Sequence, residues 1–215
     1  TRREIFLIDG SSYFYRAFYA MRNLSTSKGM PTNAIYILAR MLLKLIKEKS
    51  PQYICFVLDS KAPTERHRMY GAYKAQRPTM PEALQVQLPY IFQIVEALGI
   101  PMLQKEGIEA DDIIATAARK FKTGSKVTII SGDKDLMQLV DDDVVVWDTL
   151  KDKLYDREGV HEKFSVYPEY MADLLAIMGD SSDNIPGVPG IGEKGALELI
   201  KKMGHVPEII EHAST

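Results

Sequence analysis

The chain has 215 residues, 46% of them hydrophobic, which is enough for one main domain with a sizeable core and a small appendage. Its longest apolar stretch, "AIYILARMLLKLI", is interrupted by Arg40 and Lys44, which excludes a membrane span, and no signal-peptide pattern opens the chain. The single cysteine, Cys55, excludes an internal disulfide and a thiolate metal site, and the four histidines are scattered. We therefore expect oxygen ligands for any metal ion, and a cytoplasmic location.

Predicted strands and helices alternate along the chain. The runs of apolar or β-branched residues that predict strands are residues 4–9, 53–59, 126–133 and 144–148. The longer patterns that predict helices are residues 32–48, capped by "PTNA", then 81–98 and 110–121. From residue 168 the pattern changes to a helix, a glycine- and proline-rich turn and another helix. This order predicts an α/β fold with a mainly parallel central sheet flanked by helices, followed by a small helical module.

Each of the first three predicted strands ends in an aspartate, namely Asp9, Asp59 and Asp133. Ligands bind at the carboxyl ends of the strands in an open parallel sheet, so we expect these three side chains to gather at one edge. Asp148 also ends a predicted strand, but it has no acidic neighbours in the sequence, and we interpret it as a turn residue.

Three acidic clusters add to these strand ends: "EADD" at the start of the helix 110–121, "GDKD" and "GDSSDN". One or two such acids would be ordinary helix caps, but three clusters that converge would repel one another unless cations neutralised them. Hard divalent ions, Mg²⁺ or Mn²⁺, are the natural counter-charge, and two ions about 4 Å apart are the recurrent arrangement for phosphodiester hydrolysis. The predicted ligands are Asp9, Asp59, Glu109, Asp111, Asp112, Asp133, Asp135, Asp180 and Asp183.

Apart from these nine acids, the 27 Lys and Arg residues outnumber the remaining Asp and Glu residues, which suits a polyanionic partner. Residues 60–80 are locally basic and aromatic. Within them Arg66, Tyr70, Tyr73 or Lys74, and Arg77 fall near one face of a predicted helix, which could follow a phosphate backbone and stack on bases. The alternative is a solvated helix that uses Lys and Arg for solubility.

A second candidate nucleic-acid contact is the segment "NIPGVPGIGEKGALELI". A plain turn between helices would need only one or two glycines, whereas this one has Gly187, Gly190 and Gly192 before an amphipathic helix. Such glycines let main-chain N–H groups approach phosphate oxygens at the helix N-terminus, with Lys194 beside them. Contacts of this kind would follow the backbone of a nucleic acid rather than its sequence.

Taken together, these motifs resemble the 5′-nuclease domain of bacterial DNA polymerase I, within the flap endonuclease family. The resemblance covers nearly the whole chain and is carried by "FLIDGSSYFYRAFYA", "PTNAIY", "VLDSKAPTERHRMYGAYKAQRPTMPEAL", "GIEADDIIATAA", "SGDKDLMQLV" and "GDSSDNIPGVPGIGEKGA". It implies a PIN-like, flap endonuclease-type core over residues 1–165, with a helical arch near residues 60–85. Residues 166–215 would form a helix–hairpin–helix-type module that is truncated at its end.

The same resemblance implies roles for individual residues. The nine carboxylates would surround the metals, and Lys74 and Arg77 would act on the scissile phosphate. The residues implied in DNA binding are Arg66, Tyr73, Lys74, Arg77, Gly187, Gly190, Gly192 and Lys194. The glycine-rich hairpin would also hold a monovalent cation, K⁺. "GAYKAQRP" departs from the commoner "EYKANRP" but keeps the Tyr, Lys and Arg, and no carboxylate of the pattern is missing.

The implied activity is structure-specific 5′ cleavage of DNA near single/double-strand junctions, as in the removal of flaps and RNA primers during replication and repair. Expected partners are 5′-flap, nicked or gapped duplexes and RNA primer–DNA hybrids. We expect a monomer in the bacterial cytosol or nucleoid, fused to or acting with polymerase domains. The chain has no initiator Met and stops where family members continue, so we expect a fragment or a processed form.

Two other functional classes remain possible from the residues themselves. A metal-dependent phosphatase or phosphotransferase could use "DKD", but it would need an acid two residues after a nucleophilic Asp9, and "GSS" follows instead. A non-catalytic DNA-junction binder would keep the basic arch and the hairpin while losing metal ligands, and none is lost here.

Overall fold

The computed structural model describes residues 2–21 and 23–213. Its centre is a six-stranded sheet in the order β3-β2-β1-β4-β5-β6. All neighbouring strands are parallel except β5 and β6, which are antiparallel. The strands are β1 Arg3–Asp9, β2 Tyr53–Val57, β3 Met102–Leu103, β4 Ser125–Ile130, β5 Val144–Asp148 and β6 Lys153–Tyr155. The predicted mainly parallel sheet is therefore confirmed.

The strand order changes direction beside β1. From β1 the chain moves outward through β2 to β3, and then returns to the other side of β1, where β4 and β5 add in turn. Such a reversal leaves a crevice at the carboxyl ends of the two strands that flank it, here β1 and β4. Asp9 is the last residue of β1, and Asp133 follows β4 closely. The topology therefore brings two of the predicted ligands to the place where open α/β sheets bind ligands.

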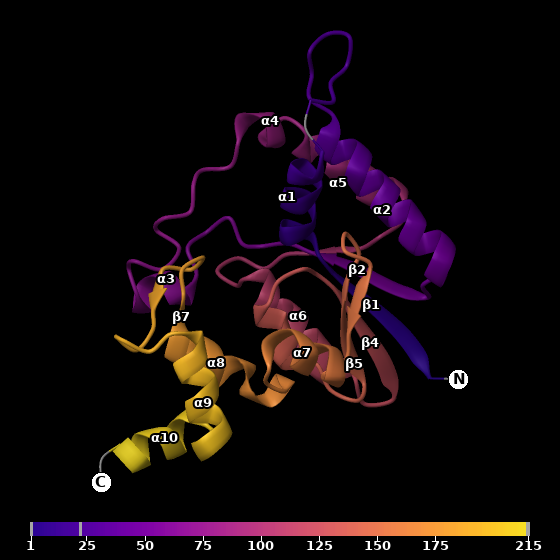
Figure 1. Ribbon diagram of the computed structural model, residues 1–215. Coiled ribbons are helices and arrows are strands. Elements are labelled where there is room, and N and C mark those ends of the chain that lie inside the picture. Colours follow the sequence, from indigo (N-terminus) through magenta and orange to yellow (C-terminus); the bar gives the residue numbers. More distant parts are fainter. Residues whose placement is uncertain (1, 22, 214–215) are drawn as a thin grey trace.

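Alternate residues of β1 point into two separate cores. Phe6 and Ile8 are buried with α1, α2 and α5 on one face of the sheet, whereas Leu7 is buried with α6 on the other face. Figure 1 shows α1, α2 and α5 grouped on one side of the strands and α6 and α7 on the other. The helices of the core are α1 Gly10–Ala20, α2 Asn33–Lys49, α3 Glu65–Met69, α4 Glu82–Gln85, α5 Leu88–Ala97, α6 Ala110–Phe121 and α7 Arg157–Phe164.

The C-terminal segment is a helical module with a short hairpin. Ala196 and Ile200 of α9 are buried in the same core as α6, so the module packs on that face of the protein. Its elements are η2 Pro168–Tyr170, α8 Met171–Met178, β7 Gly179–Asp180, β8 Ile185–Pro186, α9 Glu193–Met203 and α10 Val206–Ala213, and the 3-10 helix η1 Asp135–Leu139 precedes it in the core. Among the described residues, none of the helices combines the length and apolar character needed to cross a bilayer.

Several sequence-based element predictions need correction. Residues 81–98 form two helices rather than one, and Pro89, which lacks an N–H donor, lies in the first turn of the second helix. The helix α1, the short strand β3, the antiparallel strand β6 and the helix α7 were not predicted. The predicted cap of α2 was wrong as well, because Thr32 stands at the N-cap position but makes no side-chain capping bond.

A buried glutamine from the turn between α4 and α5 caps α2 instead. The Gln87 Oε1 atom accepts hydrogen bonds from the N–H groups of Ala34 at 2.9 Å and Ile35 at 3.2 Å. Its Nε2 atom donates to the Asn33 Oδ1 atom at 2.9 Å and to the Ala83 carbonyl at 2.7 Å. Gln87 is fully buried, so these bonds satisfy polar groups that have no access to water.

We predict that Gln87→Leu lowers the free energy of unfolding by about 1–3 kcal/mol, because two buried N–H groups at the start of α2 lose their acceptor. Chemical denaturation measures the change. Gln85→Leu is the matched control, since Gln85 is exposed two residues earlier, and it should shift stability by no more than about 0.5 kcal/mol. Equal effects of the two substitutions would show that the buried cap contributes nothing.

Candidate metal and phosphodiester site

The carboxyl ends of β1 and β4 are joined through one hydroxyl group. The Asp9 Oδ2 atom accepts a hydrogen bond from Ser131 Oγ at 2.7 Å, and the Asp9 Oδ1 atom accepts one from the Ser12 N–H at 3.0 Å. Ser131 Oγ in turn accepts from the Asp133 N–H at 3.0 Å. Asp9 is therefore both the cap of α1 and a buried acid at the strand edge, and Ser131 holds Asp133 beside it.

The start of α6 is capped by Asp59 and not by the acids of "EADD"; β2 ends at Val57, so Asp59 follows the strand and does not end it as predicted. The Asp59 Oδ1 atom accepts a hydrogen bond from the Ala110 N–H at 2.8 Å. Glu109 occupies the N-cap position but makes no capping bond, and its side chain turns instead to three other groups. Thr64 Oγ1 at 2.9 Å, Tyr73 Oη at 3.0 Å and Lys74 Nζ at 2.8 Å all donate to it. Helix capping thus does not explain why an acidic residue stands at position 109.

Four carboxylates form what we call the inner acidic group: Asp9, Asp59, Asp111 and Asp133. Burial, reinforced by the charges of Asp9, Asp133 and Asp59, raises the pKa of Asp111 to about 8. Burial also raises the pKa of Asp9 to about 6, against the lowering effect of its bonds from Ser131 and Ser12. The Asp111 carboxyl group therefore binds a proton at neutral pH when nothing else neutralises its charge.

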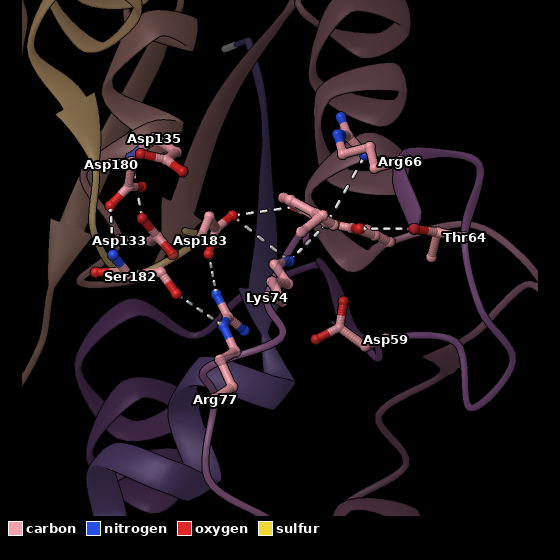
Figure 2. A network of polar contacts seen from close by, with 12 residues as sticks. Asp59, Thr64, Arg66, Lys74, Arg77, Asp133, Asp135, Asp180, Ser182 and Asp183 are labelled. Atoms are coloured by element: carbon pink, nitrogen blue, oxygen red, sulfur yellow. Dashed lines mark hydrogen bonds and ion pairs between the residues drawn. The ribbon is translucent and has the colours of Figure 1, made fainter. Parts of the chain in front are cut away.

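Three further carboxylates form the outer acidic group: Asp135, Asp180 and Asp183. One oxygen from each lies within 4.8 Å of the other two, so they could ligate one ion together. Figure 2 shows these side chains beside Asp133 at one side of the site. Burial raises the pKa of Asp135, and the Asp133 charge adds to this rise, as it does for Asp9 and Asp111. Asp133 is therefore electrostatically coupled to both groups.

Four cationic side chains balance the acids. Lys74 Nζ lies 2.8 Å from Glu109 and 3.8 Å from Asp183, and Arg77 Nη2 lies 2.5 Å from Asp183 (Figure 2). Arg66 forms a two-pronged pair with Asp112, at 2.6 and 2.8 Å, and Lys134 Nζ lies 2.7 Å from Asp180. The ion pairs that the cations complete are Arg66–Asp112, Lys74–Glu109, Arg77–Asp183 and Lys134–Asp180.

These pairs set the charge state of their acids. Burial would raise the pKa of Glu109, but the bonds and charge of Lys74, with the bonds from Thr64 and Tyr73, lower it overall. The hydrogen bond and charge of Arg66 lower the pKa of Asp112. Glu109 and Asp112 therefore stay ionised under conditions in which Asp111 is protonated. Burial, reinforced by the charges of Asp183 and Glu109, raises the pKa of Tyr73, so its hydroxyl remains a donor to both acids.

The predicted single helical face of the arch is wrong. The helix α3 ends at Met69, and residues 71–76 are turns in which Lys74 has a left-handed φ of 55°. Polar bonds to the C-terminal module hold this segment: the Lys74 N–H donates to the Asp183 carbonyl at 2.9 Å, and Asn184 Nδ2 donates to the Ala72 carbonyl at 2.7 Å. Arg66, Tyr73, Lys74 and Arg77 still converge on the acids, but from a turn instead of a continuous helix.

The glycines of the segment 187–192, which follows β8, differ in what surrounds them. A Cβ atom on Gly187 would lie 2.4 Å from the Met178 backbone, so this position is glycine because two segments of the module pack tightly there. Gly190 has a left-handed φ of 82°, and Gly192 is the N-cap of α9 with nothing within 4 Å of a built Cβ. The backbone at Gly190 and Gly192 is therefore open, and Lys194 stands exposed in the first turn of α9 beside it.

Three site residues were not predicted from the sequence: Thr64, Ser131 and Lys134. Ser131 precedes the two acids of "SGDKD" and Lys134 lies between them, so their closeness to these acids in the sequence was the available signal. Thr64 lies 45 residues from the Glu109 carboxylate that it contacts, and a distance of that kind has no local signal. Asp148 is the buried last residue of β5 and not itself a turn residue, although its Oδ1 atom accepts from the N–H groups of Leu150 and Lys151 in the following turn and also pairs with Arg16.

The fold and the site together define the class of metal-dependent nucleases. Nine carboxylates gather at the switch point of a parallel sheet, with Lys and Arg side chains between them. Family models agree with this class. The 5′-3′ exonuclease N-terminal resolvase-like domain matches residues 4–165, and the 5′-3′ exonuclease C-terminal SAM fold matches residues 166–215. The chain belongs to the 5′-3′ exonuclease family.

The relatives and solved structures that resemble this chain include 5′ exonucleases and DNA polymerases I. A 5′-3′ exonuclease of Aquifex aeolicus is 47% identical over 211 residues, which are 98% of this chain and 73% of that protein. DNA polymerase I of Bacillus subtilis is 41% identical over 215 residues, 98% of this chain but only 24% of the polymerase. Zinc-bound 5′-exonuclease of bacteriophage T5 has a TM-score of 0.80 at 27% identity, over 98% of this chain and 79% of that one.

A bacteriophage T5 flap endonuclease solved as a pseudo-enzyme-product complex with DNA and metal ions also matches, with a TM-score of 0.80 at 27% identity over 97% of this chain and 78% of that one. The family and these structural neighbours confirm the predicted 5′ nuclease and flap endonuclease resemblance. Divalent ions in the neighbours accord with the acidic groups described above.

The raised pKa of Asp111 predicts a pH-dependent stability in EDTA. Asp111 titrates near 3.8 when unfolded and near 8 when folded, so between these values the folded state alone holds the proton, and stability falls as pH rises through this window. Asp111→Asn remains neutral throughout. At pH 8.5 it should melt above the wild type by at least about 3 °C, the shift that ~1 kcal/mol gives a chain of this size.

Thermal scans at pH 5 and pH 8.5 measure this difference, which should shrink at the lower pH because wild-type Asp111 is then protonated. Asp142→Asn, an exposed acid away from the site, is the matched control and should follow the wild type at both values. If the melting temperature of Asp111→Asn changed with pH as much as that of the wild type, Asp111 would not be the group whose charge is repelled in the inner acidic group.

Proposed function

We propose that this chain is a divalent-metal-dependent, structure-specific 5′ nuclease that cuts DNA near junctions of single and double strands. The observation that carries the proposal is the pair of acidic groups joined by Asp133, with Lys74 and Arg77 projecting toward them (Figure 2). The family and the DNA-bound neighbour support the substrate class. Flap and RNA-primer removal in replication and repair are the proposed processes, in the bacterial cytosol.

The donor chemistry fits hard divalent ions. Every proposed ligand is a carboxylate, and Mg²⁺ and Mn²⁺ prefer such oxygen ligands. The inner acidic group would hold one ion and the outer acidic group a second, with Asp133 between them. When bound, the ions supply positive charge that activates water and stabilises the leaving oxygen. Glu109 and Asp112 complete the proposed set from the start of α6.

Lys74 and Arg77 are proposed to bind the phosphate under attack. Lys74 Nζ is held between the Glu109 and Asp183 carboxylates, and its side chain is only 16% exposed, so its position is fixed before substrate arrives. A cation fixed in this way costs little to reorganise when negative charge develops on the phosphate oxygens. Arg77 is half-exposed on the Asp183 side, where it could bind the same phosphate or its neighbour.

The remaining contacts to DNA are proposed from placement. Arg66 and Tyr73 would grip the 5′ strand beside the acids, while the open backbone at Gly190 and Gly192, with Gly187 packed behind and Lys194 alongside, would hold the duplex. A monovalent cation such as K⁺ at this hairpin would reinforce the phosphate contact. We further propose a monomer that is linked to or acts with polymerase domains, as the match to DNA polymerases I suggests.

We expect Asp133→Asn to abolish cleavage of a 5′-labelled flap duplex in Mg²⁺ while binding to the duplex stays equal or becomes tighter. The substitution removes a carboxylate of the inner acidic group that also interacts electrostatically with Asp135 of the outer group, and the loss of negative charge favours approach of a polyanion. Gel analysis of the products measures cleavage, and fluorescence anisotropy measures binding. Asp142→Asn should cut at the wild-type rate. Near-normal cleavage by Asp133→Asn would refute the assignment of the metal ligands.

Lys74→Ala should lower the single-turnover rate at saturating flap DNA about 100-fold, while the dissociation constant changes only a few-fold. Interactions made in the transition state appear in that rate and not in ground-state binding. Lys120→Ala removes an exposed lysine on α6 and is the control for general attraction to DNA. If Lys74→Ala weakened binding and left the saturated rate unchanged, Lys74 would contribute only to attraction.

A further inference from the structure

The loop between β7 and β8 ends in a residue with an uncommon backbone conformation. Asn184 has a left-handed φ of 58° and directly precedes β8. Asparagine tolerates this conformation better than most residues that carry a side chain, and glycine adopts it freely. The backbone alone would therefore allow glycine at this position, so the asparagine side chain needs an explanation of its own.

Both ends of the Asn184 amide are hydrogen-bonded to the segment that carries Lys74. The Asn184 Nδ2 atom donates to the Ala72 carbonyl at 2.7 Å, and its Oδ1 atom accepts from Gln76 Nε2 at 2.7 Å. A side-chain amide offers a donor and an acceptor side by side, whereas an aspartate would place a negative oxygen against the Ala72 carbonyl. Asn184 therefore bridges the two ends of the turn 72–76 from 112 and 108 residues away in the sequence.

Lys74 lies in the middle of this turn and depends on it. Its backbone has a left-handed φ of 55°, which is uncommon for lysine and persists only where surrounding bonds hold it. The Lys74 N–H donates to the Asp183 carbonyl at 2.9 Å, one residue before Asn184. The turn therefore sets the direction of the Lys74 side chain, whose Nζ atom lies 2.8 Å from Glu109.

Arg77 follows the same turn by one residue. Its N–H donates to the Lys74 carbonyl at 3.0 Å, so its direction also depends on the conformation of the turn. Figure 2 shows the Lys74 and Arg77 side chains both directed toward Asp183. The two cations proposed to bind the phosphate are thus presented by a turn whose two ends are bonded to one side chain.

We propose that Asn184 is a positioning residue for the nuclease reaction: its side-chain amide holds the turn 72–76, and through it Lys74 and Arg77, in place before DNA binds. The inference rests on the proposed function of these two cations and adds a residue that acts through them. A cation that is fixed in advance stabilises developing charge without reorganisation. Loosening the turn should therefore slow the chemical step and leave DNA binding largely unchanged.

The test separates the backbone of Asn184 from its amide. Asn184→Gly keeps the left-handed conformation and removes both amide bonds, whereas Gln76→Ala removes one bond by changing an exposed side chain. Ser165→Gly is the matched control, because Ser165 is exposed and has a left-handed φ of 60° at the end of α7. For each variant we measure the single-turnover rate at saturating flap DNA and Mg²⁺, the dissociation constant and the melting temperature.

We expect Asn184→Gly to lower the saturated rate about tenfold and to change the dissociation constant less than about twofold, since one or two hydrogen bonds are lost. Gln76→Ala should lower the same rate about threefold, and Ser165→Gly should leave it unchanged. In a Lys74→Ala background, Asn184→Gly should slow cleavage by no more than about threefold, because most of its effect passes through a group that is already absent.

Limited proteolysis gives a readout that does not depend on cleavage of DNA. Trypsin can cut after Lys74 only when the turn opens, and the rate of cutting then follows the population of the open form. In the metal-free protein, mass spectrometry should show cleavage after Lys74 about tenfold faster in Asn184→Gly than in the wild type. Ser165→Gly should be cut at the wild-type rate.

Three results would overturn the proposal. A full tenfold slowing by Asn184→Gly in the Lys74→Ala background would mean that Asn184 acts apart from Lys74. A wild-type cleavage rate and unchanged trypsin cutting for folded Asn184→Gly would mean that the amide does not hold the turn. Weaker DNA binding at an unchanged saturated rate would make Asn184 a DNA contact. Failure of the wild type to cut any flap in Mg²⁺ or Mn²⁺ would count against the nuclease function, and trypsin would still decide whether Asn184 holds the turn.

Discussion

Mutual repulsion among carboxylates at one edge of the sheet is the constraint on which the rest of the structure depends. Burial and neighbouring acids raise the pKa of Asp9, Asp111 and Asp135, so the protein keeps these groups close at a cost in stability. The acids remain together because each is tied down by other bonds: Asp9 caps α1, Asp59 caps α6, and Asp133 accepts from the Asp135 N–H. Strain of this kind is typical of functional sites.

Two of the cations that offset this repulsion, Lys74 and Arg77, come from the turn segment that follows α3 and not from the sheet itself. Lys74 and Arg77 follow the end of α3, and their segment is bonded through its backbone to Asp183 and through Ala72 to Asn184. The acids of the C-terminal module therefore help to fold the 70–77 segment, and this segment in turn neutralises them. Phosphate or metal binding would have to compete with these ion pairs, which makes the two parts of the site interdependent.

The arrangement of acids and cations at the site also bears on which substrates the protein can bind. The carboxylate oxygens suit hard cations, and the Lys and Arg side chains between them suit phosphate. Neither preference involves a base edge, so neither depends on base sequence. Both accord with the proposed recognition of DNA structure rather than base sequence.

The amino-acid sequence by itself determined the α/β class and pointed to the nine acids, because periodicity and runs of like charge are local properties. It also pointed to Arg66, Tyr73, Lys74 and Arg77 as a cluster. Only the tertiary structure decided how they are presented: the segment is a turn and not a long helix, since long-range bonds to Asp183 and Asn184 override local helical preference.

Other features had no local signal at all. Gln87 caps α2 from the turn between α4 and α5, Thr64 donates to Glu109 across 45 residues, and the cavity between Tyr70 and Ile185 joins segments that are distant in the sequence. The sequence also gave no sign that Asp59 caps α6 while Glu109, at the N-cap position, does not. The cap forms only when the fold brings the end of β2 next to the start of α6. Sequence pattern determined which groups are available, and packing decided which of them meet, because contacts between distant segments depend on topology and not on spacing along the chain.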